Sequence, residues 1–400
     1  MLSFRDDKAV YYARRCCQCG VCLSACRTGA LSARMVGEQF VIDVDKSRCT
    51  GCGLCVKACP AHEVHRVSIP ADAVSRARAI LLAYAGNAAT RRHSSSGGFT
   101  RTVIGKSLES GVVDAVYTLF YPRVSTDREG RLAGIAEEAE GRWLVSAPEM
   151  DSIPCSLYRP VLWGRNLLDG APKSGRVFLV GLPCQLKGAR SLLRIFRPKL
   201  EIFSISLMCR KNKNFDYTRY YTKLAGLSEV GCEKAVTYRG DGWPGMVKVY
   251  GNQVQEYEWI YPAKCWQLTA CEYCSDCTNA KDSDITAMDP WGIVESKQDN
   301  DGLTLAMVWT EKGLKLIESC REALKISHLD ADLAVRSFDY PAIDKKRTGV
   351  LKLVAGKGRL STAHLGRIIK ARLAERILSR FPHTSKTYAF IMKQRKRLRN

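Results

Sequence analysis

Residues 16–26 read CCQCGVCLSAC, and residues 49–60 read CTGCGLCVKACP. Each stretch contains four cysteines at the spacing Cys-x2-Cys-x2-Cys-x3-Cys, and the second copy begins 33 residues after the first. In two-cluster ferredoxins, three cysteines of such a run bind one 4Fe–4S cluster and the fourth binds the other. The duplicated spacing therefore predicts two adjacent 4Fe–4S clusters in this part of the chain.

The duplication predicts two ligand sets, namely Cys16, Cys19, Cys22 and Cys59 for one cluster, and Cys49, Cys52, Cys55 and Cys26 for the other. Gly20, Gly51 and Gly53 lie between these cysteines and let the backbone approach a cluster closely. Residues 35–45, MVGEQFVIDVD, alternate in polarity and predict two short strands around a turn. The alternative is a zinc site, but eight cysteines in this paired pattern favour iron–sulfur clusters.

The bulk composition favours a folded chain with several domains and with metal-binding cysteines. The chain has 400 residues, 18 cysteines and 26% charged residues. Its N-terminus shows no apolar signal region, and no apolar run is long enough to span a bilayer. We therefore expect a cytoplasmic protein whose cysteines bind metal more often than they form disulfides.

The net charge of +22 is concentrated at the C-terminus, where residues 345–400 contain seventeen Lys or Arg and one acidic residue, Glu375. The apolar positions there recur every four residues and predict a basic amphipathic helix; they are Leu365, Ile369, Leu373, Ile377 and Phe381. Such a tail is expected to contact an anionic membrane surface or an acidic partner. Nucleic acid is a weaker alternative, because the tail has few aromatic residues and matches no recognition fold.

Predicted strands and helices alternate between the cysteine repeat and the tail. Residues 71–90 are Ala-rich and predicted to be helical, and so are residues 100–111, 186–196 and 310–324. Apolar runs at 114–121, 174–182 and 200–209 predict buried strands, which favours a parallel or mixed sheet. The predicted fold class is thus a bacterial-type ferredoxin (1–70), a mixed α/β domain (71–335) and a basic helical extension (336–400).

Four further motifs follow in order: SSSGGF at 94–99, GLPCQ at 181–185, YRGDGWPG at 238–245, and CEYCSDC at 271–277 with DITAMDPWG at 284–292. Together they resemble the beta subunit family of coenzyme F420-reducing hydrogenases and dehydrogenases, over roughly residues 80–325. That family also includes flavin-containing chlorophyll-cycle reductases. Met288 is a small departure, since glycine often stands at this place in the family, before Asp289 and Trp291.

The resemblance implies FAD, with its pyrophosphate near Ser95–Gly98. Hydroxyls and backbone N–H groups at a helix N-terminus suit phosphate, although an ordinary serine cap is the alternative. The YRGDGWPG loop is cationic and aromatic and would suit a flavin or deazaflavin, or it is only a tight turn. The implied cofactor-binding residues are Ser95, Ser96, Gly97, Gly98, Phe99, Thr100, Arg239, Gly242 and Trp243.

The resemblance also implies a third 4Fe–4S cluster, with Cys184, Cys209, Cys271 and Cys274 as ligands. Ligands gather at the carboxyl ends of strands in such a sheet, which is where Cys184 and Cys209 are expected. Cys265 and Cys277 compete for a place in this set. The remaining cysteines, Cys17, Cys155, Cys232 and Cys320, are expected to be small buried hydrophobes. His62, His65 and His93 are expected to be surface or packed residues.

The family implies electron exchange between a hydride carrier, such as an F420-like deazaflavin, and the clusters or a redox partner protein. A flavin beside a cluster converts between hydride and single electrons. The alternative keeps the cofactors but reduces an organic substrate with electrons from ferredoxin, in envelope or polysaccharide synthesis at the membrane. Neither the donor nor the direction of electron flow follows from the sequence.

Overall fold

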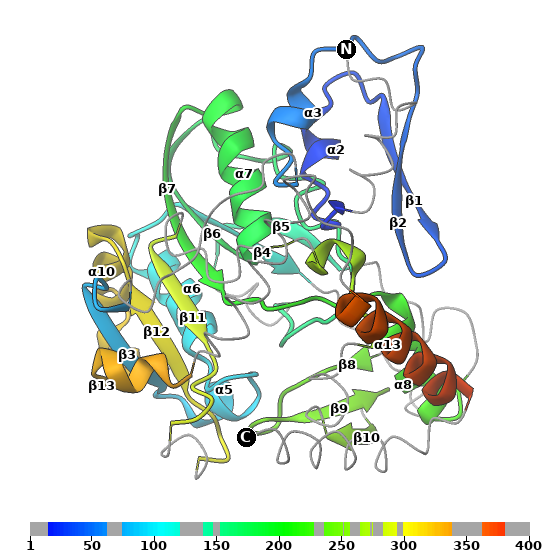
Figure 1. The fold of residues 1–400 in the computed structure, drawn as a ribbon. Coiled ribbons are helices and arrows are strands. Elements are labelled where there is room, and N and C mark those ends of the chain that lie inside the picture. Colours follow the sequence, from blue (N-terminus) through cyan, green and yellow to red (C-terminus); the bar gives the residue numbers. More distant parts are fainter. Residues whose placement is uncertain are drawn as a thin grey trace, which may run out of the picture.

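The computed structural model describes residues 15–61, 74–120, 139–146, 153–227, 236–250, 252–256, 265–272, 274, 283–293, 299–337 and 362–380. These residues form three parts, as Figure 1 shows. A small N-terminal unit lies against a large twisted sheet with helices, and a smaller sheet carries two further helices.

The N-terminal unit contains one β-hairpin and two short helices. Its elements are α2 (Val21–Ala25), β1 (Leu31–Val36), β2 (Gln39–Val44) and α3 (Leu54–Lys57). The two strands pair antiparallel from Leu31 opposite Val44 to Val36 opposite Gln39, and Gly37 in the turn has φ 60°. The predicted pair of strands around a turn is therefore confirmed.

The large sheet has eight strands in the order β13-β3-β12-β11-β7-β6-β4-β5. The four central strands β11, β7, β6 and β4 are parallel, and antiparallel strands flank them on both sides. The strands are β3 (Ala79–Ala85), β4 (Ala115–Phe120), β5 (Glu140–Leu144), β6 (Ser174–Gly181), β7 (Lys199–Leu207), β11 (Ile285–Met288), β12 (Thr304–Val308) and β13 (Leu324–His328). This mixed sheet confirms the predicted fold class.

The helix predicted over residues 71–90 is wrong. Residues 79–85, AILLAYA, form strand β3, which pairs antiparallel with both β12 and β13. A short apolar run that is buried on both faces lacks the alternation of a half-buried strand, so periodicity alone cannot separate it from a helix. The neighbouring strands decided the conformation here.

Helices cover both faces of the sheet, with α6 and α10 on one face and α7 on the other. The helices of this domain are α5 (Ala88–Arg92), α6 (Phe99–Glu109), α7 (Pro183–Phe196), α10 (Glu311–Glu318), the 3-10 helix η6 (Arg321–Ala323) and α11 (Ala331–Val335). Along β6, Phe178 and Val180 face α6 and α10, whereas Val177 and Leu179 face α7. The helices predicted over 100–111, 186–196 and 310–324 are confirmed, except that the last one ends at Glu318.

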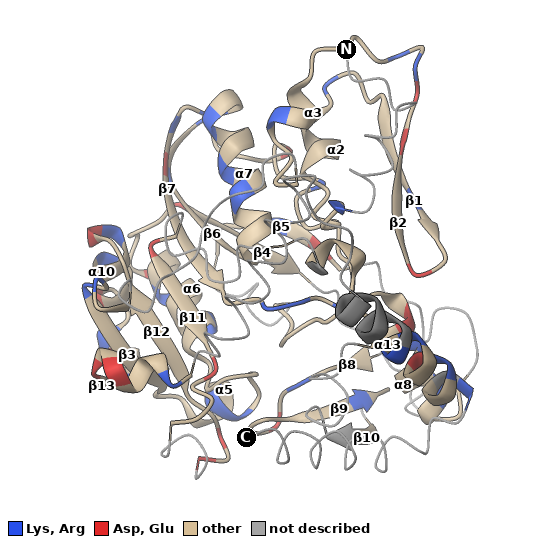
Figure 2. Ribbon diagram, in the orientation of Figure 1, with Lys and Arg blue, Asp and Glu red and all other residues tan. Residues whose placement is uncertain are grey.

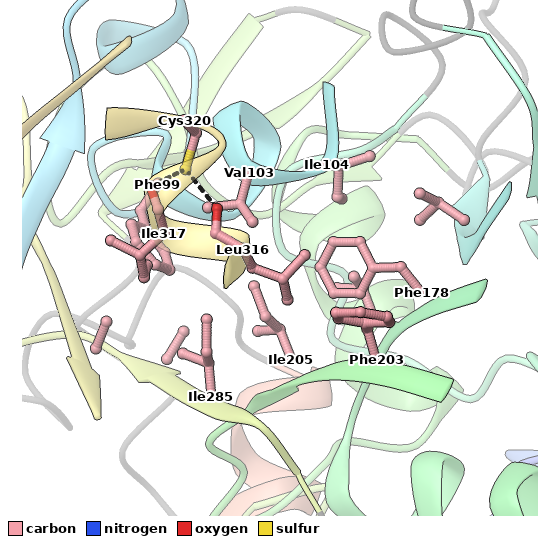
Figure 3. Packing of buried hydrophobic residues seen from close by; sticks show 14 of the residues in the cluster. Phe99, Val103, Ile104, Phe178, Phe203, Ile205, Ile285, Leu316, Ile317 and Cys320 are labelled. Carbon is pink, nitrogen blue, oxygen red and sulfur yellow. Dashed lines mark hydrogen bonds between the residues drawn. The ribbon is translucent and has the colours of Figure 1, made fainter. Parts of the chain in front are cut away.

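The first face forms the aromatic and aliphatic core drawn in Figure 3, where Phe178 and Phe203 of the sheet lie below α6 and α10. Cys320 belongs to this core, and its thiol donates to the carbonyl oxygens of Leu316 and Ile317 at 3.0 and 3.2 Å. Cys320 therefore packs as a small buried hydrophobic residue, as the sequence predicted.

The smaller sheet has the strand order β10-β9-β8 and packs against two helices. Its elements are α8 (Phe215–Leu224), β8 (Val236–Thr237), β9 (Met246–Val249), β10 (Asn252–Glu256), the 3-10 helix η4 (Thr269–Glu272) and α13 (Thr362–Arg380). Helix α13 is the predicted basic helix, and Figure 2 shows the Lys and Arg residues of its described part in blue. No helix in the described ranges has the length and apolarity needed to cross a bilayer.

Phe178→Ala should lower the free energy of unfolding by about 3–5 kcal/mol, because the ring is fully buried and its removal leaves a cavity. Urea denaturation of both proteins measures the difference. Leu373→Ala is the matched control, because Leu373 is 58% exposed and should change stability by less than about 0.5 kcal/mol. Equal losses in the two variants would contradict the assignment of this core.

Candidate iron–sulfur and flavin site

The structure brings together the four cysteines that were predicted to bind the first cluster. Cys16 is close enough to Cys19 and Cys59 to interact with them electrostatically, and Cys22 interacts in this way with all three. Burial and these neighbouring thiols raise the pKa of Cys16 to about 12. Because iron binding deprotonates thiols, a group of buried thiols of this kind is chemically suited to a cationic cluster.

Two cysteines of the second set are partly buried and two are exposed, and three of the four lie close together. Cys55 lies beside Cys26 and Cys52, and burial raises the pKa of its thiol. Cys22 of the first set also lies close enough to Cys55 to interact with it electrostatically. The two predicted clusters would therefore be neighbours, while Cys49 and Cys52 are exposed.

Two glycines with left-handed backbone give the cysteine runs their shape. Helix α2 begins after Gly20, whose φ is 74°, and helix α3 begins after Gly53, whose φ is 71°. Residues that have a side chain rarely adopt a positive φ. Glycine at these two positions therefore permits the sharp turn before each helix. The repeat thus forms two similar loops that present their thiols to one another.

A further group of thiols lies at the carboxyl edge of the large sheet. Cys184 follows β6 as the second residue of α7, and Cys209 follows β7 by two residues. Cys184 interacts with Cys209, with Cys274, and with Cys17 and Cys19 of the N-terminal unit. The edge position predicted for Cys184 and Cys209 is confirmed by their places after parallel strands.

Cys271 and Cys265 occupy different surroundings. The Cys271 Sγ atom accepts the backbone N–H of Asn212 at 3.2 Å. Cys265 is buried in the core between α8 and α13, with its thiol 3.9 Å from the carbonyl oxygen of Ala371. Cys265 therefore has a packing role, and Cys277, the other competitor, lies outside the described residues.

No group of three or more His, Cys, Asp or Glu in the described segments is arranged to hold a single metal ion. The thiolates of a 4Fe–4S cluster bind different iron atoms, so their sulfurs lie farther apart than the ligands of one ion.

The serine–glycine loop before α6 is held on several sides. Its backbone enters the helix through Gly97 and Gly98, whose φ values are 71° and 76°. The hydroxyl of Ser96 donates to Asp289 at 2.6 Å, and the hydroxyl of Ser95 accepts the backbone N–H of Ser156 at 2.8 Å. The N-cap residue of α6 is Gly98 and no side chain caps the helix, so none of the serines is its N-cap.

Asp289 links three of the sequence motifs. It follows β11 directly and accepts two hydrogen bonds from Arg239, at 2.8 and 3.0 Å, and one from the indole N–H of Trp243 at 2.9 Å. Burial alone would raise the pKa of Asp289, but the Arg239 guanidinium and the bonds from Ser96 and Trp243 outweigh burial and lower the pKa. Arg239 also donates through Nε to the carbonyl oxygen of Pro244 at 2.8 Å.

A turn at residues 299–302, which none of the sequence motifs predicted, completes this arrangement. Trp243 donates its backbone N–H to Asn300 at 2.6 Å, and a Cβ atom on Gly97 would lie 2.4 Å from the carbonyl oxygen of Gly302. Arg91 forms an ion pair with Asp299. The sequence NDG at 300–302 signals a turn, and it was the only available hint.

The other predicted site residues lie as follows. Phe99, the first residue of α6, is fully buried in the core of the large sheet, and Thr100 is half-buried. Gly242 donates its backbone N–H to Arg92 at 2.9 Å. His93 is exposed, as expected, and its Nδ1 lies 2.6 Å from Asp241. Contact of the predicted residues with FAD stays a prediction, and Cys232, His62 and His65 lie outside the described residues.

Two family models match the chain. Residues 15–62 match the 4Fe-4S dicluster domain, and residues 174–332 match the C terminus of the coenzyme F420 hydrogenase/dehydrogenase beta subunit. The protein is thus an iron–sulfur oxidoreductase by class. More narrowly, residues 174–332 are similar to the C terminus of the coenzyme F420 hydrogenase/dehydrogenase beta subunit, and they follow residues similar to a 4Fe-4S dicluster domain, which is the resemblance that the sequence motifs indicated.

Among solved structures, the chain is similar to a chain of the F420-reducing NiFe hydrogenase complex from Methanosarcina barkeri. The sequence identity is 14% and the TM-score is 0.48, with 68% of this chain and 90% of that chain covered. No curated protein matches the chain.

Asp289→Asn should lower the free energy of unfolding at pH 7 by about 3–5 kcal/mol, because it leaves the buried Arg239 charge unpaired. The folded-state pKa of Asp289 is lowered, so its stabilisation is present above the unfolded pKa of about 3.9 and is lost as the pH falls through the folded value. Urea denaturation at several pH values should therefore show a full deficit at pH 7 that shrinks below about pH 4.

Asp43→Asn is the control for this variant. Asp43 pairs with Arg34 on the exposed hairpin, so this substitution should change the free energy of unfolding by less than about 1 kcal/mol. A deficit of Asp289→Asn that is the same at pH 7 and pH 3 would show that charge pairing is not its cause.

Proposed function

We propose that this protein is a flavin-dependent oxidoreductase that exchanges electrons between a hydride carrier and ferredoxin-type clusters or a partner protein. One observation supports this proposal most. Thiols of both domains interact with Cys184 at the carboxyl edge of the large sheet, and Asp289 lies at the same edge because it follows β11. The name of the matched family suggests an F420-like deazaflavin as the hydride carrier.

The residues present suit the cofactors that this function needs. The two sets of cysteines in the ferredoxin domain suit two 4Fe–4S clusters. The cysteines around Cys184 suit a third cluster. When bound, a flavin would exchange hydride for single electrons and the clusters would carry those electrons.

The serine–glycine loop would hold the flavin. Helix α6 has eleven residues, and its first N–H groups and the hydroxyl of Ser95 would face an anionic pyrophosphate, while Ser96 holds the loop to Asp289. Asp289 would act as a positioning residue, because its hydrogen bonds fix the loop against Arg239 and Trp243. Trp243 packs against Trp291 with ring centroids 4.5 Å apart, which would give a planar cofactor an aromatic boundary.

Gly97→Ala should abolish flavin binding and leave iron binding intact. The added methyl group would lie 2.4 Å from the carbonyl oxygen of Gly302, so the loop must move away from its conformation. The measurement is an anaerobic count of flavin, iron and acid-labile sulfide per chain. The wild type should contain one FAD and about twelve irons, as expected for three 4Fe–4S clusters.

Gly111→Ala is the matched control, because Gly111 has a similar φ of 66° but no atom within 4 Å of an added Cβ. It should keep the full flavin content. Wild-type protein with about eight irons and no flavin would refute the proposed function and leave only the ferredoxin part. Full flavin in Gly97→Ala would refute the assignment of this loop.

A specific observation favours the second candidate, a ferredoxin-dependent flavin reductase that acts on an organic substrate at a membrane surface. On α13, Ala374 and Leu378 are buried, while Leu373 and Ile377 are 58% and 47% exposed. Three arginines lie beside this apolar pair at a spacing of four residues, and they are exposed as well; they are Arg372, Arg376 and Arg380. Cationic and apolar residues on one exposed helix face suit an anionic lipid surface.

The double variant Leu373→Glu with Ile377→Glu should lose most of its binding to vesicles that contain anionic phospholipid, because charge replaces the inserting apolar pair. Co-sedimentation measures the bound fraction. Val145→Glu is the control, since Val145 is 69% exposed, directly follows β5 and is far from α13 in sequence. If the wild type, the double variant and Val145→Glu sediment equally with the vesicles, the proposed membrane binding is refuted.

A further inference from the structure

The segment 162–164 of the second domain is fixed against the first cysteine run of the ferredoxin domain. Gly164 donates its N–H to the carbonyl oxygen of Cys19 at 2.6 Å. A Cβ atom on Gly20 would lie 3.0 Å from the backbone of Leu162. Because Gly20 and Gly164 have no side chain, the two backbones can approach each other this closely. Trp163, in the middle of this segment, is therefore held next to the loop that carries Cys19.

The indole of Trp163 packs against the turn that leads from β6 into α7. A Cβ atom on Gly181, the last residue of β6, would lie 3.2 Å from Cζ2 and 3.4 Å from Cε2 of the indole. Since Cε2 is bonded to Nε1, the edge of the ring that bears the N–H is next to this turn. Cys184 follows Gly181 by three positions and is the second residue of α7. The N–H edge of Trp163 thus borders the segment that presents Cys184.

The indole N–H of Trp163 has no hydrogen-bond partner among the residues that the structure describes. Trp163 is 1% exposed, and its Nε1 is buried without an acceptor. A buried N–H group without a partner is costly and therefore rare in folded proteins. By contrast, the indole N–H of Trp143 in the same core donates to the carbonyl oxygen of Leu167 at 2.9 Å. The N–H of Trp163 therefore points to an acceptor that is bound to the protein.

Tyr117 fixes Trp163 in this position. Its hydroxyl donates to the carbonyl oxygen of Trp163 at 2.7 Å, and the two rings pack edge to face with centroids 4.8 Å apart. An N–H directed at an aromatic ring makes only a weak interaction, so the Tyr117 ring is a poor substitute for a full acceptor.

We propose that the indole N–H of Trp163 donates a hydrogen bond to a sulfur of the cluster bound at Cys184, and thereby sets part of the reduction potential of that cluster. This inference rests on the proposed function, because it requires the third cluster. Hydrogen bonds to the sulfurs are among the factors that set the potentials of iron–sulfur clusters. An N–H from the segment that touches Cys19 would thus act on the cluster of the second domain.

The direction of the effect follows from charge. One-electron reduction makes the sulfurs more negative, so a hydrogen bond to them is stronger in the reduced state than in the oxidised state. The bond therefore favours the reduced state and raises the reduction potential. Removal of the N–H should shift the potential to a more negative value.

The test uses the full-length chain, purified without oxygen, and follows a redox titration by electron paramagnetic resonance (EPR). Replacement of Trp163 by benzothienylalanine exchanges the N–H for a sulfur atom in a ring of nearly the same shape, and Trp163→Phe removes the N–H with a smaller ring. Both proteins should keep about twelve irons and show one midpoint potential that is more negative than in the wild type. The shifted signal should be the one that Cys184→Ala abolishes.

Trp143→Phe is the matched control, because Trp143 also packs on Tyr117, with ring centroids 5.0 Å apart, but its N–H is bonded to Leu167. It should leave all potentials unchanged. A purely structural role of Trp163 would not produce a second readout, which is pulsed EPR of protein labelled with ¹⁵N in the indole ring. A nitrogen coupling should appear on the signal that depends on Cys184 and should be absent in Trp163→Phe.

Unchanged potentials in both Trp163 variants would overturn the inference and leave the N–H with the Tyr117 ring or with water. A shift confined to a signal that Cys16→Ala abolishes would also overturn it, because the N–H would then act on the first ferredoxin cluster. Wild-type protein with about eight irons, unchanged in Cys184→Ala, would instead refute the third cluster and the proposed function with it.

Discussion

The buried ion pair between Arg239 and Asp289 is the interaction on which the candidate site depends. Both side chains are removed from water, and a buried charge is tolerated only when its partner and its hydrogen bonds are complete. Asp289 accepts hydrogen bonds from Arg239, Trp243 and Ser96, so its buried charge is compensated. The pair adds little net stability over an apolar substitute. Its effect is to hold three loops from distant parts of the sequence in one arrangement.

A second constraint is the close approach of the two domains. Cys19 and Gly164 meet through their backbones, and the hairpin of the ferredoxin domain reaches α8 through a bond from the Phe215 N–H to the Glu38 carbonyl oxygen at 2.9 Å. Phe40 and Phe215 pack edge to face at 5.5 Å. Because contacts exist at α7 and at α8, the ferredoxin domain has a single orientation on the second domain. That orientation is what brings thiols of both domains together.

The basic C-terminal segment is part of the folded body as well as a charged surface. Glu375, its only acidic residue, is buried and accepts the backbone N–H of Trp266 at 2.6 Å. Ala374 and Leu378 join the core of the smaller sheet on the same face of α13. The opposite face carries the exposed arginines and the pair Leu373 and Ile377. Removing the whole segment would therefore disturb a core, whereas exchange of surface residues leaves it intact.

The sequence by itself determined the ferredoxin repeat, the order of most strands and helices, the family of the second domain and the amphipathic C-terminal helix. These features depend on local spacing and periodicity, which remain visible in a linear chain. It did not determine strand β3, because a run such as AILLAYA has no periodicity of its own and its strand partners come from residues 304–308 and 324–328. Only the tertiary structure decided that Asp289 joins three motifs and that Cys17 contacts Cys184. The three contacts of Asp289 join residues separated by 46, 50 and 193 positions. The partners in such contacts are set by packing and by the satisfaction of buried charges and hydrogen bonds.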